Sequence, residues 1–100
     1  MSPLPYIISK KAIADLDNIW LYTVEKWSVQ QANHYYNLIF DEINYICLEP
    51  ESGRQMDQIR NGYRVSKVKS HLIFYRVVNG MVEVIRILHR RMDIENRLAD

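Results

Sequence analysis

"HLIFYRVVNGMVEVIRILHRRMD", residues 71–93, is the stretch that decides the fold. Two runs of β-branched, aliphatic and aromatic residues flank Asn79 and Gly80. This pair is favoured in a two-residue type I′ turn because both positions tolerate a positive φ. The stretch therefore predicts an antiparallel β-hairpin whose second strand ends in the basic segment from His89 to Arg91.

The turn also fixes a register for this hairpin. The expected cross-strand pairs are Val78–Met81, Arg76–Glu83, Tyr75–Val84, Phe74–Ile85, Ile73–Arg86 and Leu72–Ile87. Arg76 then has a carboxylate opposite, whereas Arg86 has none. We expect Arg86 either to extend to water or to receive an anionic group of another molecule. The same register sets His71 opposite Leu88, on the face that His89 does not occupy.

Two helices are predicted before the hairpin, following a short strand in "PLPYIIS", residues 3–9. Ser9 can cap the first helix, whose apolar positions recur at steps of three and four: Ile13, Leu16, Trp20, Val24 and Trp27. Ser28 and Gln31 match a capping box that starts the second helix at once. Its apolar stripe is Val29, Ala32, Tyr36, Ile39, Ile43 and Ile46. Pro50 closes this helix, and so tight a connection predicts an antiparallel helical hairpin.

The second half of the chain has the pattern of a sheet. Residues 63–69 are rich in β-formers but mixed in polarity, and residues 71–78 form a nearly continuous apolar run typical of a central strand covered on one face. The fold class is therefore α+β, with an N-terminal strand, an antiparallel helical hairpin and a mostly antiparallel sheet, in one domain over residues 1–100. We expect a hydrophobic groove beside the helices that a partner segment fills.

The charged residues are unevenly distributed along the chain. Residues 1–53 carry three lysines against seven carboxylates, whereas residues 54–100 carry ten basic residues against five carboxylates. The two halves should present opposite fields. A basic half suits nucleic acid, an acidic protein surface or an acidic partner segment, and charge does not choose among the three.

The remaining composition is that of a small globular protein. Hydrophobic residues make up 48% of the chain, no apolar run has membrane length, and no basic region precedes an apolar one at the N-terminus. Cys47 has no second cysteine to pair with, and its place on the apolar helical stripe indicates a small buried residue. We therefore expect a cytoplasmic protein with no membrane segment.

No cofactor or metal site is indicated. His34, His71 and His89 lie on different elements without metal-ligand spacing, and the three glycines form no phosphate-binding loop. Trp20 and Trp27 fall on the apolar stripe of the first helix, where a core position is the first interpretation. If one of them is exposed instead, it becomes a docking position for a partner.

The order of elements and several motifs resemble the ParE toxins of the RelE/ParE superfamily over nearly the whole chain. The resemblance is strongest in "IRILHRRMD", residues 85–93. "WSVQQANHYYNLIFDEI", residues 27–43, resembles the family's entry to the second helix, and "IRNGYR", residues 59–64, its lead-in to the sheet. The glycine that usually follows the tryptophan is Ser28 here, which its capping role explains.

The resemblance implies a bacterial toxin of a type II toxin–antitoxin module that inhibits DNA gyrase, blocks replication and arrests growth. A ParD-like or other cognate antitoxin would neutralise it in a hetero-oligomer, and the module would stabilise a plasmid or chromosome. The surface for gyrase or its DNA complex would be Arg86, His89, Arg90, Arg91 and Met92. The antitoxin contacts would be Trp20, Trp27, Tyr36 and Tyr63.

The alternative is an enzyme, and it depends on which residues are available for catalysis. RelE-type relatives cut messenger RNA on the ribosome, which requires a base, an acid and cations around the phosphate. The available cations are Arg86, Arg90, Arg91 and Arg97, and His89 could act as base or acid. The expected register gives His89 no tyrosine, glutamate or second histidine on its face, and "MDIENRLAD", residues 92–100, lacks the late tyrosine that many such ribonucleases use. We expect a binder with no catalytic residue; a ribonuclease and a non-toxic interaction module remain alternatives.

Overall fold

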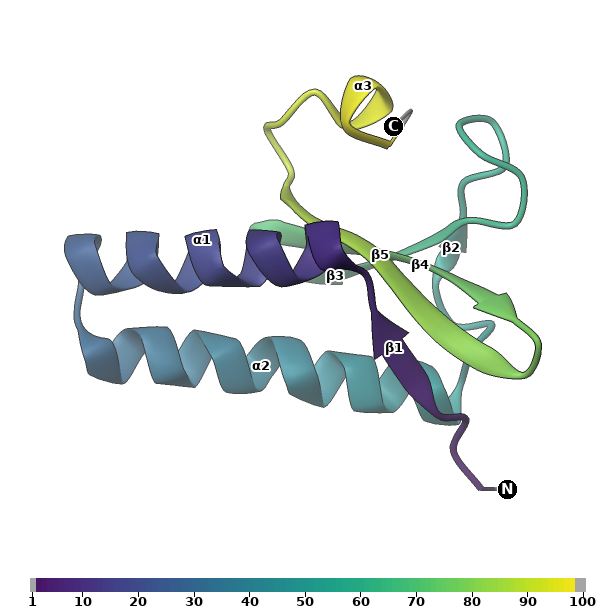
Figure 1. Ribbon diagram of the computed structural model, residues 1–100, viewed down its shortest axis with the longest axis horizontal. Coiled ribbons are helices and arrows are strands. Elements are labelled where there is room, and N and C mark those ends of the chain that lie inside the picture. The colour runs from purple at the N-terminus through teal and green to yellow at the C-terminus, as the bar shows by residue number, and fades with distance from the viewer. Residues whose placement is uncertain (1, 99–100) are drawn as a thin grey trace.

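A mixed five-stranded sheet carries a long helical hairpin on one face (Figure 1). The structure is a computed structural model that describes residues 2–98. Its elements are β1 (Tyr6–Ile8), α1 (Lys10–Lys26), α2 (Val29–Leu48), β2 (Arg54–Gln55), β3 (Arg64–Val68), β4 (His71–Val78), β5 (Met81–His89) and α3 (Ile94–Leu98). The sheet order is β1-β5-β4-β3-β2, in which β1 pairs in parallel with β5 and the other neighbours are antiparallel.

Both predicted helix caps are confirmed. The Ser9 hydroxyl accepts a hydrogen bond from the backbone N–H of Ala12 at 3.0 Å, and the Ser28 hydroxyl accepts one from Gln31 at 3.0 Å. Each cap satisfies a backbone donor that the first turn of a helix leaves unpaired. Because the second cap follows α1 directly, α2 turns back beside α1 as an antiparallel hairpin whose tip projects beyond the sheet (Figure 1).

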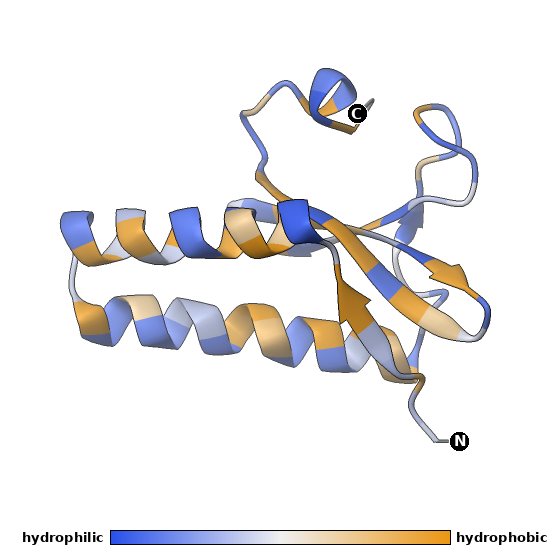
Figure 2. Ribbon diagram, in the orientation of Figure 1, coloured by the Kyte–Doolittle hydropathy of each residue, from blue (hydrophilic) through white to orange (hydrophobic). Residues whose placement is uncertain are grey.

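The main core lies between this hairpin and the sheet. Its buried side chains come from α1, α2, β3, β4 and β5: Ala12, Leu16, Ile39, Ile43, Ile46, Cys47, Val68, Ile73, Tyr75, Val82, Val84 and Ile87. Ile13, expected on the apolar stripe of the first helix, is exposed, and Ala12 is buried instead. Hydrophobic residues recur along both helices at the matching spacing (Figure 2). Cys47 is buried as expected. Trp27 and Val29 are exposed, because they lie at the hairpin tip beyond the sheet; the core position expected for Trp27 is therefore wrong.

A second, smaller core covers the opposite face of the sheet, so the expectation that the central strand is covered on one face is wrong. Its buried members are Met56, Val65, Phe74, Leu88 and Leu98. The chain returns after β5 as α3, which the sequence analysis did not predict, and α3 places Leu98 over this face. The strand β2 was not predicted either.

The buried Tyr75 hydroxyl donates to the Pro50 carbonyl at 2.8 Å and accepts from the Gly53 N–H at 2.9 Å. Because the Tyr75 ring lies against Gly53, a Cβ atom at position 53 has no room.

The predicted hairpin turn is confirmed, and so is the register next to it. Asn79 and Gly80 have φ values of 53° and 70°. The pairs Val78–Met81, Arg76–Glu83 and Tyr75–Val84 are those expected. Arg76 donates to the Glu83 carboxylate at 2.6 Å, which confirms its cross-strand partner.

Beyond Tyr75 the predicted register is wrong by one residue. Phe74 lies opposite Arg86 and not Ile85, which leaves Ile85 as the extra residue of a β-bulge. The next pairs are accordingly Ile73–Ile87, Leu72–Leu88 and His71–His89. His71 and His89 are therefore direct neighbours, contrary to the expectation that they occupy different faces.

The bulge lies where the outer edge of β5 stops pairing with β1 and is bonded instead by the side chains of Ser9 and Asp15. The strand β1 pairs with β5 only as far as Val84. Past that point the Ser9 hydroxyl donates to the Ile85 carbonyl at 2.7 Å, and Asp15 of α1 accepts from the Ile87 N–H at 3.0 Å. A helix cap and a carboxylate thus replace the strand ladder beside the extra residue.

Arg86 contacts the same carboxylate. Its Nε and Nη2 atoms each donate to Asp15 at 2.8 Å, and both side chains are only 11% exposed. Both expectations for Arg86 are therefore wrong, because the register placed no acid near it while the fold brings one from α1. Paired, bidentate geometry of this kind compensates for the removal of two charges from water.

Replacing Asp15 by Asn should lower the free energy of unfolding by about 3 kcal/mol, because the change removes the carboxylate charge that pairs with the nearly buried Arg86 guanidinium. Urea unfolding at pH 7 measures this change. The control is Asp17→Asn, two residues along the same helix at an exposed position, which should change stability by no more than about 0.5 kcal/mol. Equal effects of the two substitutions would contradict the role assigned to the ion pair.

Candidate functional site

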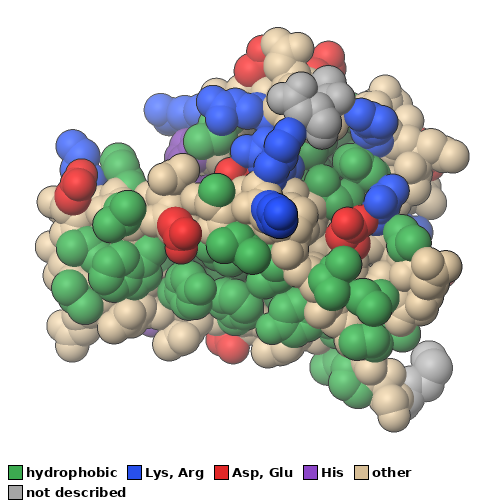
Figure 3. Space-filling model, in the orientation of Figure 1, with side chains coloured by type: hydrophobic (Ala, Val, Ile, Leu, Met, Phe, Trp, Pro, Cys, Tyr) green, Lys and Arg blue, Asp and Glu red, His purple; other side chains and the backbone are tan. Residues whose placement is uncertain are grey.

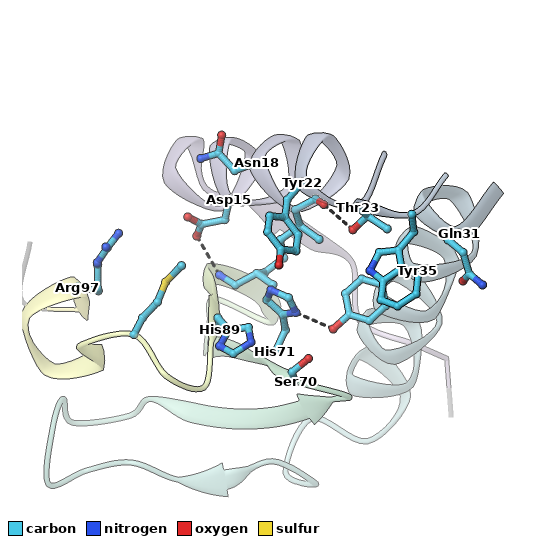
Figure 4. A pocket seen from close by; sticks show the side chains of 14 residues that line it. Asp15, Asn18, Tyr22, Thr23, Gln31, Tyr35, Ser70, His71, His89 and Arg97 are labelled. Atoms are coloured by element: carbon cyan, nitrogen blue, oxygen red, sulfur yellow. Dashed lines mark hydrogen bonds between the residues drawn. The ribbon is translucent and has the colours of Figure 1, made fainter. Parts of the chain in front are cut away.

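A groove of about 820 Å³ opens between the helical hairpin and the ends of β4 and β5 (Figure 4). The two helices α1 and α2, the strands β4 and β5, and the chain that follows β5 supply its walls. The lining residues are Asp15, Asn18, Ile19, Tyr22, Thr23, Trp27, Gln31, Tyr35, Ser70, His71, Ile87, His89, Met92 and Arg97. Aliphatic and aromatic side chains form much of this surface, which suits an apolar segment of another molecule.

The floor of the groove contains a phenol and two imidazoles in contact. The Tyr35 hydroxyl lies 2.6 Å from His71 Nδ1 and donates to the Val68 carbonyl at 3.1 Å. The rings of His71 and His89 meet edge to face with centroids 5.2 Å apart. The shifted register produces this cluster, because it places the last residue of β5 opposite the first residue of β4.

The two groups that α2 and β4 bring together are uncharged near neutral pH. The pKa of His71 is lowered to about 4, mainly by burial and also by the nearby His89, while Asp15 opposes the shift. Burial also raises the pKa of the Tyr35 phenol. The floor therefore presents neutral hydrogen-bonding groups within a mostly apolar groove.

Beside the groove, the chain leaves β5 in a tight turn, residues 90–93, which we call the exit turn. Three backbone hydrogen bonds fix its start: Arg90 N–H donates to the Ser70 carbonyl at 2.9 Å, Arg91 N–H to His89 Nδ1 at 3.1 Å, and Met92 N–H to the His89 carbonyl at 2.9 Å. The side chains of Arg90, Arg91 and Met92 are exposed. The turn thus presents two guanidinium groups and a thioether from a fixed backbone.

The structure brings together most of the residues predicted to contact the target. His89 and Met92 line the groove, and Arg90 and Arg91 are exposed in the exit turn beside it. Arg86 lies behind them in its ion pair with Asp15. Of these five, Arg86 alone is nearly buried, so the structure gives it a supporting position.

The residues predicted to contact an antitoxin are not brought together. Trp27 lines the groove and is 75% exposed. Trp20 donates to the Asn33 side chain at 3.3 Å, and Tyr36 packs on Phe40 with ring centroids 4.9 Å apart. Tyr63 packs against the second core on the other face of the sheet.

Sequence reasoning missed several groove residues, of which Tyr22, Tyr35 and His71 are the main ones. A signal for one wall was present, since Asp15, Ile19 and Tyr22 recur at steps of four and three and so share a face of α1. That face adjoins the core stripe. Because the charged Asp15 interrupts its apolar pattern, the sequence pattern did not indicate it. Nothing local could indicate the place of His71, because it depends on the bulge.

Metal clusters and membrane-spanning helices are absent from the described part of the chain. Within residues 2–98, no group of three His, Cys, Asp or Glu side chains is arranged to hold a metal ion. None of the helices in this range combines the length and the apolar character that crossing a membrane requires.

Residues 6–94 match the family described as the ParE toxin of the type II toxin–antitoxin system parDE. This chain belongs to the ParE toxin family. Toxin ParE1 of Mycobacterium tuberculosis is 40% identical over 94 residues, which cover 93% of this chain and 96% of that protein. Toxin ParE1 of Caulobacter vibrioides is 40% identical over 95 residues, covering 95% and 98%. Toxin ParE of Escherichia coli is 30% identical over 96 residues, covering 95% and 93%.

Two solved structures share the fold of this ParE-family chain. One is from the chromosomal ParDE toxin–antitoxin system of P. aeruginosa, with a TM-score of 0.76, 20% identity and coverage of 86% of this chain and 95% of that one. The other is from the RelBE2 toxin–antitoxin complex of Mycobacterium tuberculosis, with a TM-score of 0.58, 18% identity and coverage of 89% and 100%. The predicted α+β fold of the RelE/ParE type is confirmed.

The stability of the protein should fall as the pH is lowered from about 6.5 to about 4 in a way that depends on His71. In this window the unfolded chain binds a proton at His71, whose ordinary pKa is 6.5, whereas the folded chain, with a pKa of about 4, does not. Acid therefore favours the unfolded state. Urea unfolding at pH 7 and pH 4.5 should show a smaller loss for His71→Gln than for the parent protein. A matched change at the exposed His34 of α2 should leave the loss unaltered, and an unaltered loss in His71→Gln would contradict the assignment.

Proposed function

We propose that this ParE-family chain inhibits DNA gyrase and so blocks replication, and that a cognate antitoxin neutralises it by filling the groove. The observation that carries the proposal is the exit turn, which holds Arg90 and Arg91 outward on a hydrogen-bonded backbone. Guanidinium groups presented in this way suit carboxylate or phosphate recognition. Gyrase or its cleaved DNA complex is the target that the resemblance to ParE toxins implies.

The surface composition supports a binder. Figure 3 shows hydrophobic side chains gathered over the helical hairpin and β1, while Lys and Arg side chains concentrate toward the side where the chain leaves β5 and forms α3. Met92 adds an adaptable apolar contact next to the two arginines. We assign target contact to the exit turn together with His89, and a supporting role to Arg86.

The antitoxin belongs in the groove because apolar surface of this extent is costly to leave in water. Trp27, three-quarters exposed at the hairpin tip, lines the groove and offers the largest aromatic surface for a partner. Buried tryptophans commonly dominate the energy of protein interfaces. The related structures from ParDE and RelBE2 systems support an antitoxin partner. We place this hetero-oligomer in the bacterial cytoplasm, with residues 1–100 acting as one toxin domain.

One observation favours a second candidate, a ribosome-dependent ribonuclease. Contrary to the expectation that no second histidine lies beside His89, the ring of His71 contacts that of His89, and the Tyr35 hydroxyl contacts His71 in turn. Two imidazoles in different environments could act as base and acid. We rank this candidate second because apolar residues such as Ile19, Tyr22 and Ile87 border the cluster, whereas a scissile phosphate needs cations around it.

Charge reversal in the exit turn should abolish growth arrest without unfolding the domain. Arg90→Glu and Arg91→Glu each replace an exposed donor group by a repelling charge, so gyrase inhibition should fall at least about 100-fold, whereas folding stability should change by no more than about 0.5 kcal/mol. Supercoiling assays with purified protein measure the first effect and thermal unfolding the second. Arg54→Glu, an exposed arginine on β2, is the charge-matched control and should remain inhibitory. Equal inhibition by all the variants would contradict the proposal.

The groove assignment predicts that Trp27→Ala weakens antitoxin binding by about tenfold or more, because the change removes the largest exposed aromatic ring of the groove. Isothermal titration of the purified toxin with its cognate antitoxin measures the affinity. Tyr45→Ala, an exposed aromatic position on α2 that does not line the groove, is the control. Weakening by the control but not by Trp27→Ala would show that the antitoxin binds elsewhere.

One experiment distinguishes gyrase inhibition from messenger RNA cutting. The purified protein is assayed side by side for inhibition of gyrase supercoiling and for ribosome-dependent cutting of messenger RNA, with His89→Gln and His71→Gln as variants. Gyrase inhibition that survives both substitutions supports the first candidate, because glutamine keeps hydrogen bonding but cannot transfer a proton near neutral pH. Messenger RNA cutting that either substitution abolishes, with gyrase unaffected, would establish the ribonuclease instead.

A further inference from the structure

The two imidazoles on the groove floor each have one ring nitrogen left over. Their Nδ1 atoms are engaged, that of His71 with the Tyr35 hydroxyl and that of His89 with the Arg91 N–H. Neither Nε2 atom has a hydrogen-bond partner among residues 2–98. Neither atom is buried, because no buried side-chain nitrogen or oxygen in this range lacks a partner. Both histidines line the groove, so an apolar partner that covers this floor would leave their Nε2 atoms unpaired.

The contacts of Nδ1 determine which nitrogen of His89 carries the proton. A backbone N–H is always a donor, so the bond from Arg91 requires a lone pair on His89 Nδ1. The neutral ring must then carry its proton on Nε2. His89 consequently offers the groove a hydrogen-bond donor.

The opposite tautomer of His71 satisfies both contacts of the Tyr35 hydroxyl. The Tyr35 hydroxyl has one proton, and the Val68 carbonyl, which is only an acceptor, takes it at 3.1 Å. The phenol oxygen then accepts from His71 Nδ1–H across the 2.6 Å contact. His71 is neutral at pH 7, so its Nε2 atom is a lone-pair acceptor on a ring that lines the groove in contact with the His89 ring.

We propose that His71 and His89 together bind one primary carboxamide, the side chain of an Asn or Gln within the apolar segment of the antitoxin that fills the groove. The carboxamide oxygen accepts from His89 Nε2–H, and its NH₂ group donates to His71 Nε2. Rings whose centroids are 5.2 Å apart lie within the reach of a single carboxamide. The proposal rests on the assignment of the antitoxin to the groove and adds the chemistry that the antitoxin must carry.

Charged groups fit this floor less well. A carboxylate has no proton for His71 Nε2, and an ammonium group has no acceptor for His89 Nε2–H. Either would leave a polar atom unpaired under an apolar partner, which costs more than the bond that is made. A carboxylate of the antitoxin segment would instead fit the end of the groove lined by the exposed Arg97 (Figure 4).

The tautomers are measured first, in the isolated protein. A long-range ¹H–¹⁵N correlation spectrum at pH 7.5 should show His89 protonated on Nε2 and His71 on Nδ1. Benzamide, an apolar ring bearing a primary carboxamide, is then titrated as a probe and should shift both Nε2 signals. Benzoate lacks the donor and should leave His71 Nε2 unchanged. Two rings with the same tautomer, or benzamide that moves neither signal, would overturn the proposal.

Substitutions that mimic one ring nitrogen at a time test the antitoxin itself. Asparagine places its amide near the position of Nδ1 and glutamine near that of Nε2. His89→Asn and His71→Asn should thus keep the contacts with Arg91 and Tyr35 but weaken antitoxin binding about tenfold each. His89→Gln and His71→Gln keep a group at the Nε2 position and should bind within about threefold of the parent protein.

The outcomes separate this proposal from the groove assignment. Weakening by Trp27→Ala, with both Asn variants binding like the parent, would overturn the carboxamide site while the groove assignment stands. Unchanged affinity in Trp27→Ala and in both Asn variants would overturn both. A double-mutant cycle identifies the carboxamide. One Asn→Leu or Gln→Leu change in the antitoxin should weaken its binding to the parent toxin. The same change should have no further effect on binding to the His89→Asn toxin.

Discussion

The carboxylate of Asp15 holds the bulge in β5, and the arrangement of the site follows from it. This one side chain accepts hydrogen bonds from the Arg86 guanidinium and from the Ile87 backbone at the point where β1 no longer pairs with β5. The extra residue, Ile85, shifts the rest of the strand by one position. His89 then meets His71 on the groove floor, and the exit turn begins beside them.

The sequence allowed the elements to be predicted where the determining contacts are local. The Asn79-Gly80 turn and the serine caps of both helices act within four residues, and all were predicted correctly. The register beyond Tyr75 failed because the bulge depends on Asp15, which is 71 residues away from Arg86. The short α3 was missed since five residues carry little periodic signal and its place depends on the second core.

The candidate site was predictable in part for the same reason. Arg90, Arg91 and Met92 follow directly from the end of a strand that the sequence identifies, and the structure exposes all three. The groove is built by side chains from α1, α2 and two strands, so its members could not be selected without the fold. Trp27 shows the difference: its spacing fits the core stripe, yet the helix extends past the sheet at that point and leaves the ring exposed.

The central claim is that a bulge locked by Asp15 sets the register at the end of the hairpin, and proton–proton contacts in solution test it directly. A nuclear Overhauser spectrum of the folded protein should show contacts across the strands between His71 and His89 and between Ile73 and Ile87. Contacts of Leu72 with Ile87 and of Ile73 with Arg86 would instead indicate a continuous register from the turn. That result would contradict the account, because the two imidazoles would then lie on opposite faces of the sheet.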